Sequence, residues 1–66
     1  MSEGRVRWFS KSKRYGFVIT DLGDVFIHYS AFKEHFIPKK NELISFNIIE
    51  GEKGLKAEEI ERIKKG

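Results

Sequence analysis

Residues 13–29 read KRYGFVITDLGDVFIHY, two short apolar runs on either side of a turn. Successive side chains of a β-strand point to opposite faces of a sheet. If both runs are strands, one face of the pair carries four rings, those of Tyr15, Phe17, Phe26 and His28. The opposite face then carries only small or aliphatic residues, Gly16, Val18, Val25 and Ile27. The stretch therefore predicts a hairpin with one ring-bearing face and one face suited to a core.

Turn-forming residues recur at short intervals on both sides of this stretch, with segments rich in Val, Ile, Phe and Tyr between them. This spacing is typical of a small all-β protein of about five strands. The expected strands span residues 5–10, 15–21, 24–29, 43–50 and 55–63. In the fourth segment Ile44, Phe46 and Ile48 alternate with polar residues, as in a half-buried strand.

The last segment is ambiguous between strand and helix. Ile60 and Ile63 are three residues apart, and Glu58 and Arg62 form a helical i,i+4 pair. Intrinsic propensity also favours a helix. We expect a strand, because a five-stranded barrel needs one to close. In the long connection after the third strand, Ser30 is expected to cap a single helical turn that reaches Glu34.

A tight five-stranded barrel has little interior volume. Seven residues already supply its lining, namely Val6, Val18, Val25, Ile27, Ile44, Phe46 and Ile48. The rings could be core instead, since aromatic residues on strands usually bury a large area, but the valines and isoleucines between them would then face solvent. We therefore expect the rings to form an exposed patch, which usually marks a binding surface.

The remaining aromatic residues are assigned by position. Trp8 and Phe9 are adjacent, so only one of them faces the core unless a bulge intervenes, and we assign Trp8 to the surface. Two more rings lie in the long connection. We expect Phe36 to fold over the rim of the ring patch, and Phe32 to pack at the rim of the barrel.

Length and composition limit the classes of protein. The chain has 66 residues and no cysteine, so we expect one domain over residues 1–66 without disulfides or thiolate metal sites. No apolar stretch has the length of a membrane span or a signal-peptide core. With polar residues after Met1, we expect a cytoplasmic protein that does not bind membranes. We expect a monomer, with a dimer as the open alternative.

The net charge of +3 is unevenly distributed. Residues 1–40 carry 8 basic and 4 acidic side chains, whereas residues 41–66 carry 5 and 6. The basic surplus therefore coincides with the rings, and Lys13 and Arg14 stand directly beside them. Bases of a single-stranded nucleic acid stack on rings while cations follow its phosphates, so this combination predicts a polyanionic partner.

Two other functions are weaker interpretations. The ring patch could bind a hydrophobic protein partner, or His28 with Asp24 could serve a hydrolytic enzyme. The enzyme lacks a recognisable nucleophile, and His28 and His35 have no third ligand at a metal-binding spacing. Asp21 and Asp24 flank a Leu-Gly turn and are expected to be solvated. We therefore expect no enzyme activity, no ATP hydrolysis, no metal and no cofactor.

The order of motifs resembles a known family. Residues 13–18 (KRYGFV) resemble the first ribonucleoprotein motif and residues 25–29 (VFIHY) the second. Together with GRVRWF at 4–9, Ser-Ala at 30–31 and Glu-Gly at 50–51, they resemble the bacterial cold-shock proteins from about residue 3 to residue 57. The resemblance implies a five-stranded antiparallel barrel of the OB type. It also implies an RNA chaperone that binds single-stranded RNA and DNA, with a preference for pyrimidine-rich stretches.

The resemblance also assigns site residues. The stacking surface of the family corresponds to Trp8, Tyr15, Phe17, Phe26, His28, Tyr29 and Phe36, and its cations to Arg7, Lys13 and Lys53. Arg14, a further candidate cation, replaces the usual glycine of the first motif. Because arginine adopts positive φ reluctantly, either the hairpin is reshaped or that backbone does not need positive φ. Asn41 also replaces a usual glycine, but asparagine tolerates the left-handed conformation.

Overall fold

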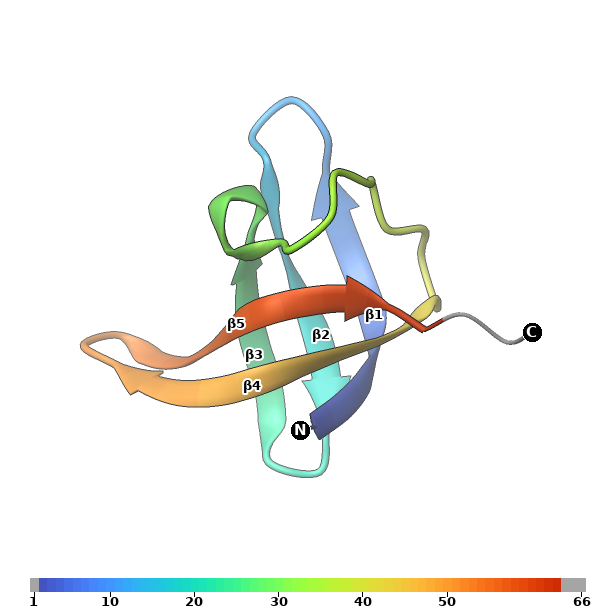
Figure 1. Ribbon diagram of the computed structural model, residues 1–66. Helices are drawn as coiled ribbons and strands as arrows, with labels where there is room; N and C mark the ends of the chain where they lie inside the picture. The colour runs from blue at the N-terminus through green and yellow to red at the C-terminus, as the bar shows by residue number, and fades with distance from the viewer. Residues whose placement is uncertain (1, 64–66) are drawn as a thin grey trace.

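The computed structural model describes residues 2–63. This part of the chain contains five strands and one short 3₁₀ helix (Figure 1). The elements are β1 (Ser2–Ser10), β2 (Tyr15–Thr20), β3 (Gly23–His28), η1 (Tyr29–Ala31), β4 (Leu43–Gly51) and β5 (Gly54–Arg62). The last segment is thus a strand, as expected. None of the helical structure in residues 2–63 has the length and apolar character that a membrane crossing requires.

The strands close into a barrel in the order β1-β2-β3-β5-β4, with β4 pairing back onto β1. Every ladder is antiparallel except the short contact between β3 and β5, which is parallel and joins Phe26 to Lys56. The predicted all-β, five-stranded OB-type barrel is confirmed. In Figure 1, β1, β2 and β3 form a steep sheet, and the long β4–β5 hairpin crosses it.

The barrel interior holds eight buried hydrophobic side chains: Val6, Val18, Val25, Ile27, Ile44, Phe46, Ala57 and Ile60. Six of the seven residues predicted for the lining are among them. The seventh, Ile48, is partly buried and packs against the cluster. Ala57 and Ile60 come from β5, the segment whose sequence does not distinguish strand from helix.

A β-bulge in β1 places Val6 and Trp8 on opposite faces although they are two residues apart. Val6 pairs with Val18, but Trp8 pairs with Phe17, so Arg7 is an extra residue in the ladder. An extra residue reverses the alternation of side chains beyond it. As a result Val6 is fully buried, whereas Trp8 is 40% exposed, in agreement with its assignment to the surface. Phe9 then turns inward and packs against the core.

Gly16 lies one pair beyond this bulge and allows β1 and β2 to approach closely there. It pairs with Phe9. A Cβ atom at position 16 would overlap the carbonyl oxygen of Trp8 and lie 2.7 Å from the Cα of Phe9. The close approach of the two backbones therefore requires glycine in the first ring-bearing run.

The short helix differs from the prediction. It spans Tyr29–Ala31 rather than a turn from Ser30 to Glu34, and His28 caps it instead of Ser30. The Nδ1 atom of His28 accepts a hydrogen bond from the Ser30 backbone N–H at 3.1 Å and lies 2.9 Å from the Ser30 hydroxyl. The helix starts immediately after β3, so the imidazole at the strand end is the acceptor within reach. The third strand accordingly ends at His28 and not at Tyr29.

The connection from η1 to β4 ends beside β1. The Asn41 backbone N–H donates to the Val6 carbonyl at 2.7 Å, and the Val6 N–H donates to the Glu42 carbonyl at 2.9 Å. Asn41 has φ of 70°, consistent with the tolerance expected of asparagine. Residues 41 and 42 therefore continue the surface of the sheet past its β1 edge.

Candidate nucleic-acid interface

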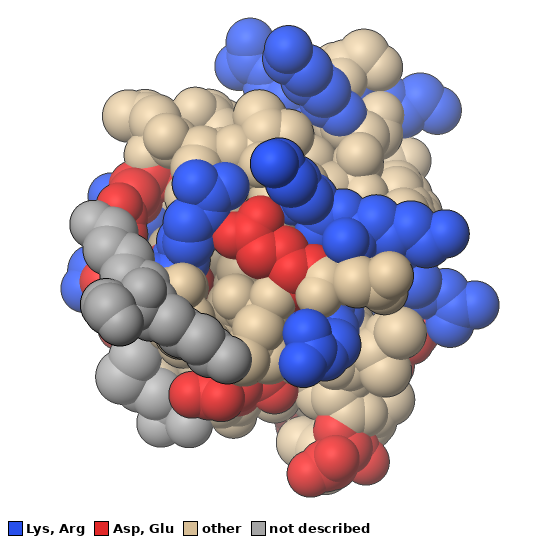
Figure 2. Space-filling view, turned by 90° about the vertical axis from the view of Figure 1, so that its right-hand side faces the viewer, with Lys and Arg blue, Asp and Glu red and all other residues tan. Residues whose placement is uncertain are grey.

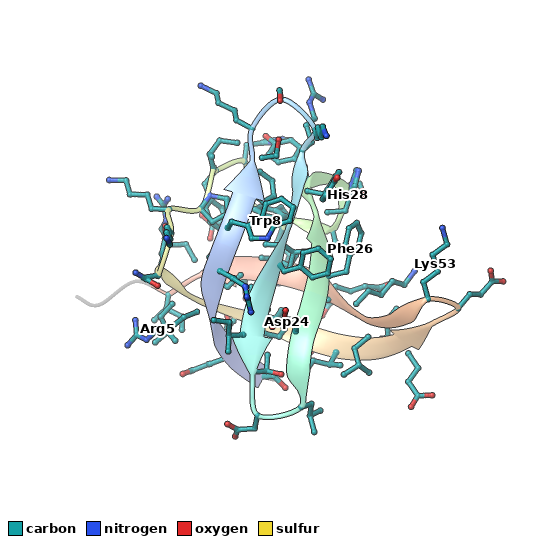
Figure 3. The ribbon with its side chains drawn as sticks, turned by 180° about the vertical axis from the view of Figure 1, so that it is seen from behind. Arg5, Trp8, Asp24, Phe26, His28 and Lys53 are labelled. Carbon is teal, nitrogen blue, oxygen red and sulfur yellow. The ribbon has the colours of Figure 1, made fainter. Side chains whose placement is uncertain are left out.

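Five ring-bearing side chains lie next to one another on the outer face of β1, β2 and β3 (Figure 3). We call them the ring face: Trp8, Tyr15, Phe17, Phe26 and His28. The strand register brings them together, because Tyr15 pairs with His28 and Phe17 pairs with both Phe26 and Trp8. The predicted parity of the two motifs is confirmed, and the bulge in β1 adds Trp8 to the same face.

The rings support one another through tilted and edge contacts. The Trp8, Tyr15, Phe17 and Phe26 rings lie 5.6–5.7 Å from their neighbours between centroids, and Phe26 lies 6.3 Å from His28. The interplanar angles run from 36° to 71°, so none of these pairs is a parallel stack. Such contacts stabilise aromatic clusters modestly. The result is a supported but uncovered apolar surface.

Two hollows flank Phe26. The larger, about 1060 Å³, lies between the rings and the tip of the β4–β5 hairpin, where Lys53 and Lys56 line it. The smaller, about 470 Å³, lies beyond Phe26 and is lined by His28, Ser30 and Lys33 among others. Phe26 and its partner Lys56 line both. Figure 3 shows Lys53 on the projecting hairpin, to one side of the rings.

Arg7 lies at the ring face in a weak ion pair. Its Nη1 is 3.4 Å from the Asp24 Oδ2, and the two side chains are 57% and 47% exposed. Exposed pairs of this kind contribute at most about 1 kcal/mol. The guanidinium can therefore exchange Asp24 for a phosphate at little cost.

The turn between β1 and β2 carries the other candidate cations of this region. Lys13 and Arg14 are both exposed there. Arg14 has φ of 62°, so the chain keeps the left-handed backbone despite the arginine. The Arg14 N–H donates to the Ser10 carbonyl at 2.7 Å, and its carbonyl accepts from the Tyr29 N–H at 2.9 Å. The alternative that this backbone does not need positive φ is therefore wrong, and the arginine itself takes the strained conformation.

Two predicted stacking residues lie elsewhere. Tyr29 and Phe36 belong to a second group, the loop ring cluster, with Phe32 and His35. Phe36 lies 4.9 Å from Phe32 between centroids, and the Arg62 guanidinium lies 4.6 Å from the Phe36 ring. The expectation that Phe36 folds over the rim of the ring patch is therefore wrong for this structure. The binding roles of Tyr29 and Phe36 stay predictions.

The loop ring cluster closes one end of the barrel. Phe32 packs against the core and Phe9, and it forms an isolated parallel bridge with Ile60. The Lys33 N–H donates to the Ile60 carbonyl at 2.9 Å. These contacts fix the connection against β5 and place the Phe32 ring against the apolar core. The expected packing of Phe32 at the barrel rim is confirmed.

The groups considered for hydrolysis or metal binding have other partners. His28 caps η1, and Asp24 pairs with Arg7. Within residues 2–63 there is no group of three or more His, Cys, Asp or Glu side chains placed to hold a metal. Because Nδ1 of His28 accepts the Ser30 N–H, the neutral ring carries its hydrogen on Nε2. That atom can donate to the edge of a base.

Sequence reasoning missed three features of this region. Lys56 lies at both hollows because of the parallel β3–β5 contact, which local patterns do not reveal. Asp24 is predicted to be solvated, yet it neutralises part of the Arg7 charge. Ser30 is predicted to cap a helix, whereas it orients His28. For Asp24, the alternation with Phe26 and His28 along one strand is a usable signal.

Comparisons with known proteins agree with this geometry. The family model of the 'Cold-shock' DNA-binding domain matches residues 2–63. A cold shock-like protein of Thermotoga maritima is 46% identical over 82% of this chain and 86% of its own length. Cold shock-like protein CspLB of Listeria monocytogenes and cold shock protein CspB of Bacillus caldolyticus are each 35% identical over 96% of this chain and 100% of their own length.

Proposed function

Because this chain belongs to the family of the cold-shock DNA-binding domain, we propose that it binds single-stranded RNA and DNA on the ring face and acts as an RNA chaperone. The family supports nucleic-acid binding in general. The observation that carries the finer proposal is the uncovered group of five rings with cations at its borders. A single strand matches such a surface because its bases are free to leave one another and stack on protein rings.

Stacking supplies the base-contacting part of the affinity. Each base that stacks on an aromatic side chain contributes about 1–3 kcal/mol by alanine substitution. Every base has a π-face, so stacking discriminates weakly among sequences. We propose a modest preference for pyrimidine-rich strands, with His28 Nε2 as a donor for the carbonyl oxygens on a pyrimidine edge. Polar side chains at the two hollows would further adjust this base preference.

Phosphate contacts supply the salt-dependent part. Each phosphate neutralised on a single strand adds about −0.7 to the slope of log affinity against log salt concentration. If Arg7, Lys13 and Lys53 each contact one phosphate, the slope is about −2. Arg14 is placed to add a fourth contact from the same turn as Lys13.

The chaperone activity follows from mass action. A protein that binds only unpaired strands removes them from the pairing equilibrium, so the duplex opens without ATP. The effect grows with protein concentration and needs no conformational cycle. A small barrel with an open face is sufficient for it.

The test is quenching of Trp8 fluorescence by an oligothymidine, titrated at several salt concentrations. We expect strong quenching and an affinity that falls as salt rises, because Trp8 is the single tryptophan and lies on the ring face. Phe17→Ala should weaken binding by about 1–3 kcal/mol. Ile19→Ala is the matched control, since Ile19 is exposed on the same strand but carries no ring.

The opposite results would contradict the proposal. A folded wild-type protein that shows no quenching at low salt does not use this face for bases. Binding with no salt dependence would favour the rival function, in which the ring face meets a hydrophobic protein partner. Equal losses in Phe17→Ala and Ile19→Ala would show that ring stacking is not the source of affinity.

A further inference from the structure

A second group of cations lies on the side of the barrel beyond the β1 edge. We call Arg5, Lys39 and Lys40 the basic patch; all three are exposed. Figure 2 shows Lys and Arg side chains gathered around a small acidic group on this side of the molecule. A hollow of about 460 Å³ lies here, lined by Lys39, Lys40, Asn41, Glu42 and Arg62. None of these residues belongs to the ring face.

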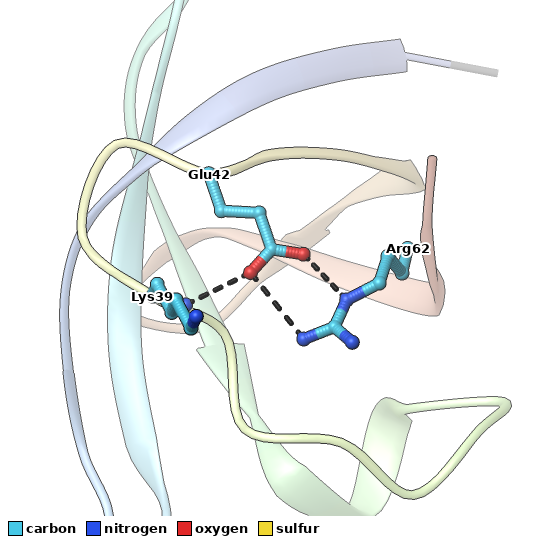
Figure 4. Close-up of polar contacts among 3 residues, drawn as sticks. All are labelled: Lys39, Glu42 and Arg62. Carbon is cyan, nitrogen blue, oxygen red and sulfur yellow. Dashed lines mark hydrogen bonds and ion pairs between the residues drawn. The ribbon is translucent and has the colours of Figure 1, made fainter. Parts of the chain in front are cut away.

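The acidic residue of this hollow is already neutralised. Glu42 accepts hydrogen bonds from the Arg62 Nε at 2.6 Å, from the Arg62 Nη2 at 3.4 Å and from the Lys39 backbone N–H at 3.0 Å (Figure 4). Burial raises its pKa, but these hydrogen bonds and the charges of Arg62 and Lys39 outweigh burial and lower the pKa below the ordinary 4.5. Glu42 thus stays ionised and paired with Arg62, and both its oxygens are occupied.

The basic patch keeps a net positive charge, because Glu42 forms its ion pair with Arg62. Within residues 2–63, Arg5, Lys39 and Lys40 form no ion pair. Arg5 is instead held in place by a hydrogen bond from its Nη1 to the Asn41 carbonyl at 3.1 Å. The patch therefore presents three positive side chains, and Arg5 is oriented by the same loop that carries Lys39 and Lys40. An array of this kind suits a polyanion with repeated charges.

Strand β1 makes the patch continuous with the ring face. On one side β1 pairs with β2; on the other it pairs with β4 as far as Arg5 and is then hydrogen-bonded to residues 41 and 42. Arg7 reaches the ring face, while Arg5, two residues earlier, reaches the loop. Figure 3 shows Arg5 beyond the β1 edge, on the far side of that strand from Phe26. A nucleic-acid backbone that contacts Arg7 and then crosses β1 would therefore contact Arg5 next.

We propose that a single strand bound on the ring face continues over β1, and that Arg5, Lys39 and Lys40 bind the phosphates of its flanking nucleotides. The inference rests on the proposed function and extends its site. The patch carries no exposed ring, and its one exposed large apolar neighbour is Ile37. The contacts there are accordingly to phosphate, without base stacking or base preference. They lengthen the occupied strand and steepen its salt dependence.

The experiment compares two oligothymidines, of about 6 and about 16 nucleotides, across a tenfold range of salt concentration. The measured quantity is the ratio of long-strand to short-strand affinity. If Arg5, Lys39 and Lys40 each bind one flanking phosphate, the ratio falls about 125-fold over that salt range in the wild-type protein. In Lys39→Gln/Lys40→Gln, where only Arg5 remains, the ratio should fall about 5-fold, while short-strand affinity is unchanged.

A charge-matched pair of single variants separates local contact from net charge. Lys40→Gln and Leu22→Glu each lower the net charge by one, but Leu22 is exposed in the turn between β2 and β3. We expect the ratio to fall about 25-fold in Lys40→Gln and about 125-fold in Leu22→Glu over the tenfold salt range. Urea unfolding of each variant verifies that the barrel is intact.

The remaining outcomes overturn the inference. The inference is wrong if the affinity ratio falls with salt as steeply in the double variant as in the wild-type protein. It is also wrong if the ratio falls equally in Lys40→Gln and Leu22→Glu. Both results leave the proposed function standing, because the short strand still binds the ring face. If the wild-type protein does not bind the short strand at all, the proposed function fails, and this inference fails with it.

Discussion

The two faces of the β1–β3 sheet are built from the same strands but differ in what covers them. On the inner face Val18, Val25 and Ile27 are fully buried. On the outer face the alternate positions of β2 and β3 hold rings of intermediate burial, which pack against one another and keep part of their surface open to solvent. A partly exposed ring contributes less to folding than a fully buried one, since stability grows with the apolar area removed from water. In these strands the buried aliphatic side chains therefore contribute most to the stability of the barrel, while the rings keep an apolar surface open to solvent.

Phe46→Ala, inside the barrel, is expected to break the fold. Its side chain is fully buried, and removing a buried phenylalanine costs about 3–5 kcal/mol. That approaches the whole stability of a domain of this size. The variant should be largely unfolded by circular dichroism at 25 °C. Phe17→Ala on the outer face, where the ring is only partly buried, should lower the urea midpoint much less. Equal destabilisation by the two variants would mean that the ring face is structural.

Glu42→Gln tests whether a polar contact outside the core contributes less to the free energy of unfolding than a buried side chain does. Because the pKa of Glu42 is lowered in the folded protein, its contribution is fully present above pH 4.5 and is lost as pH falls through the lower folded value. We expect the variant to lose about 1 kcal/mol of unfolding free energy at pH 7, since the paired side chains are 19% and 40% exposed.

The pH dependence isolates this residue from the other carboxylates. Urea unfolding of wild type and Glu42→Gln, measured from pH 7 down to acid, should give a stability difference that shrinks as pH falls below 4.5. Lys33→Gln, which breaks the more exposed pair with Glu61, is the matched control and should cost less. If the stability difference between wild type and Glu42→Gln stays constant with pH, the charge of Glu42 does not contribute to the stability of the folded protein.

Arg14→Gly is expected to give the smallest effect and to separate stability from binding at the border of the ring face. Glycine adopts positive φ without strain, so the variant should gain up to about 1 kcal/mol, reduced by the greater freedom of glycine in the unfolded chain. If Arg14 contacts a phosphate, the salt slope should also become shallower by about 0.7. Urea midpoints and salt-dependent titrations measure the two effects.

Lys13→Gly is the control for that variant. It removes the same charge from the adjacent position, where φ is not positive. It should therefore destabilise the protein while changing the salt slope similarly. If both glycine variants destabilise equally, the left-handed conformation of Arg14 carries no strain.

Much of the fold is predictable because the pattern is local. The period of two in residues 15–18 and 25–28 is enough to place the rings on one face, and the buried lining follows from the same parity. The helical cap and the position of Phe36 are not predictable in this way. Each depends on where an element ends and which surface the chain meets next, and such ends are the least reliable part of sequence interpretation.

The amino-acid sequence by itself determined the alternation, the charge asymmetry and the motifs of the family. These properties are local, since they depend on which residues stand two apart or side by side. Only the tertiary structure decided that a bulge at Arg7 turns Trp8 outward, that Lys56 faces Phe26 across a parallel contact, and that the loop cations continue the β1 edge. Register, closure and the path of a loop arise from contacts between residues distant in the chain, and the interior that satisfies them all selects one arrangement.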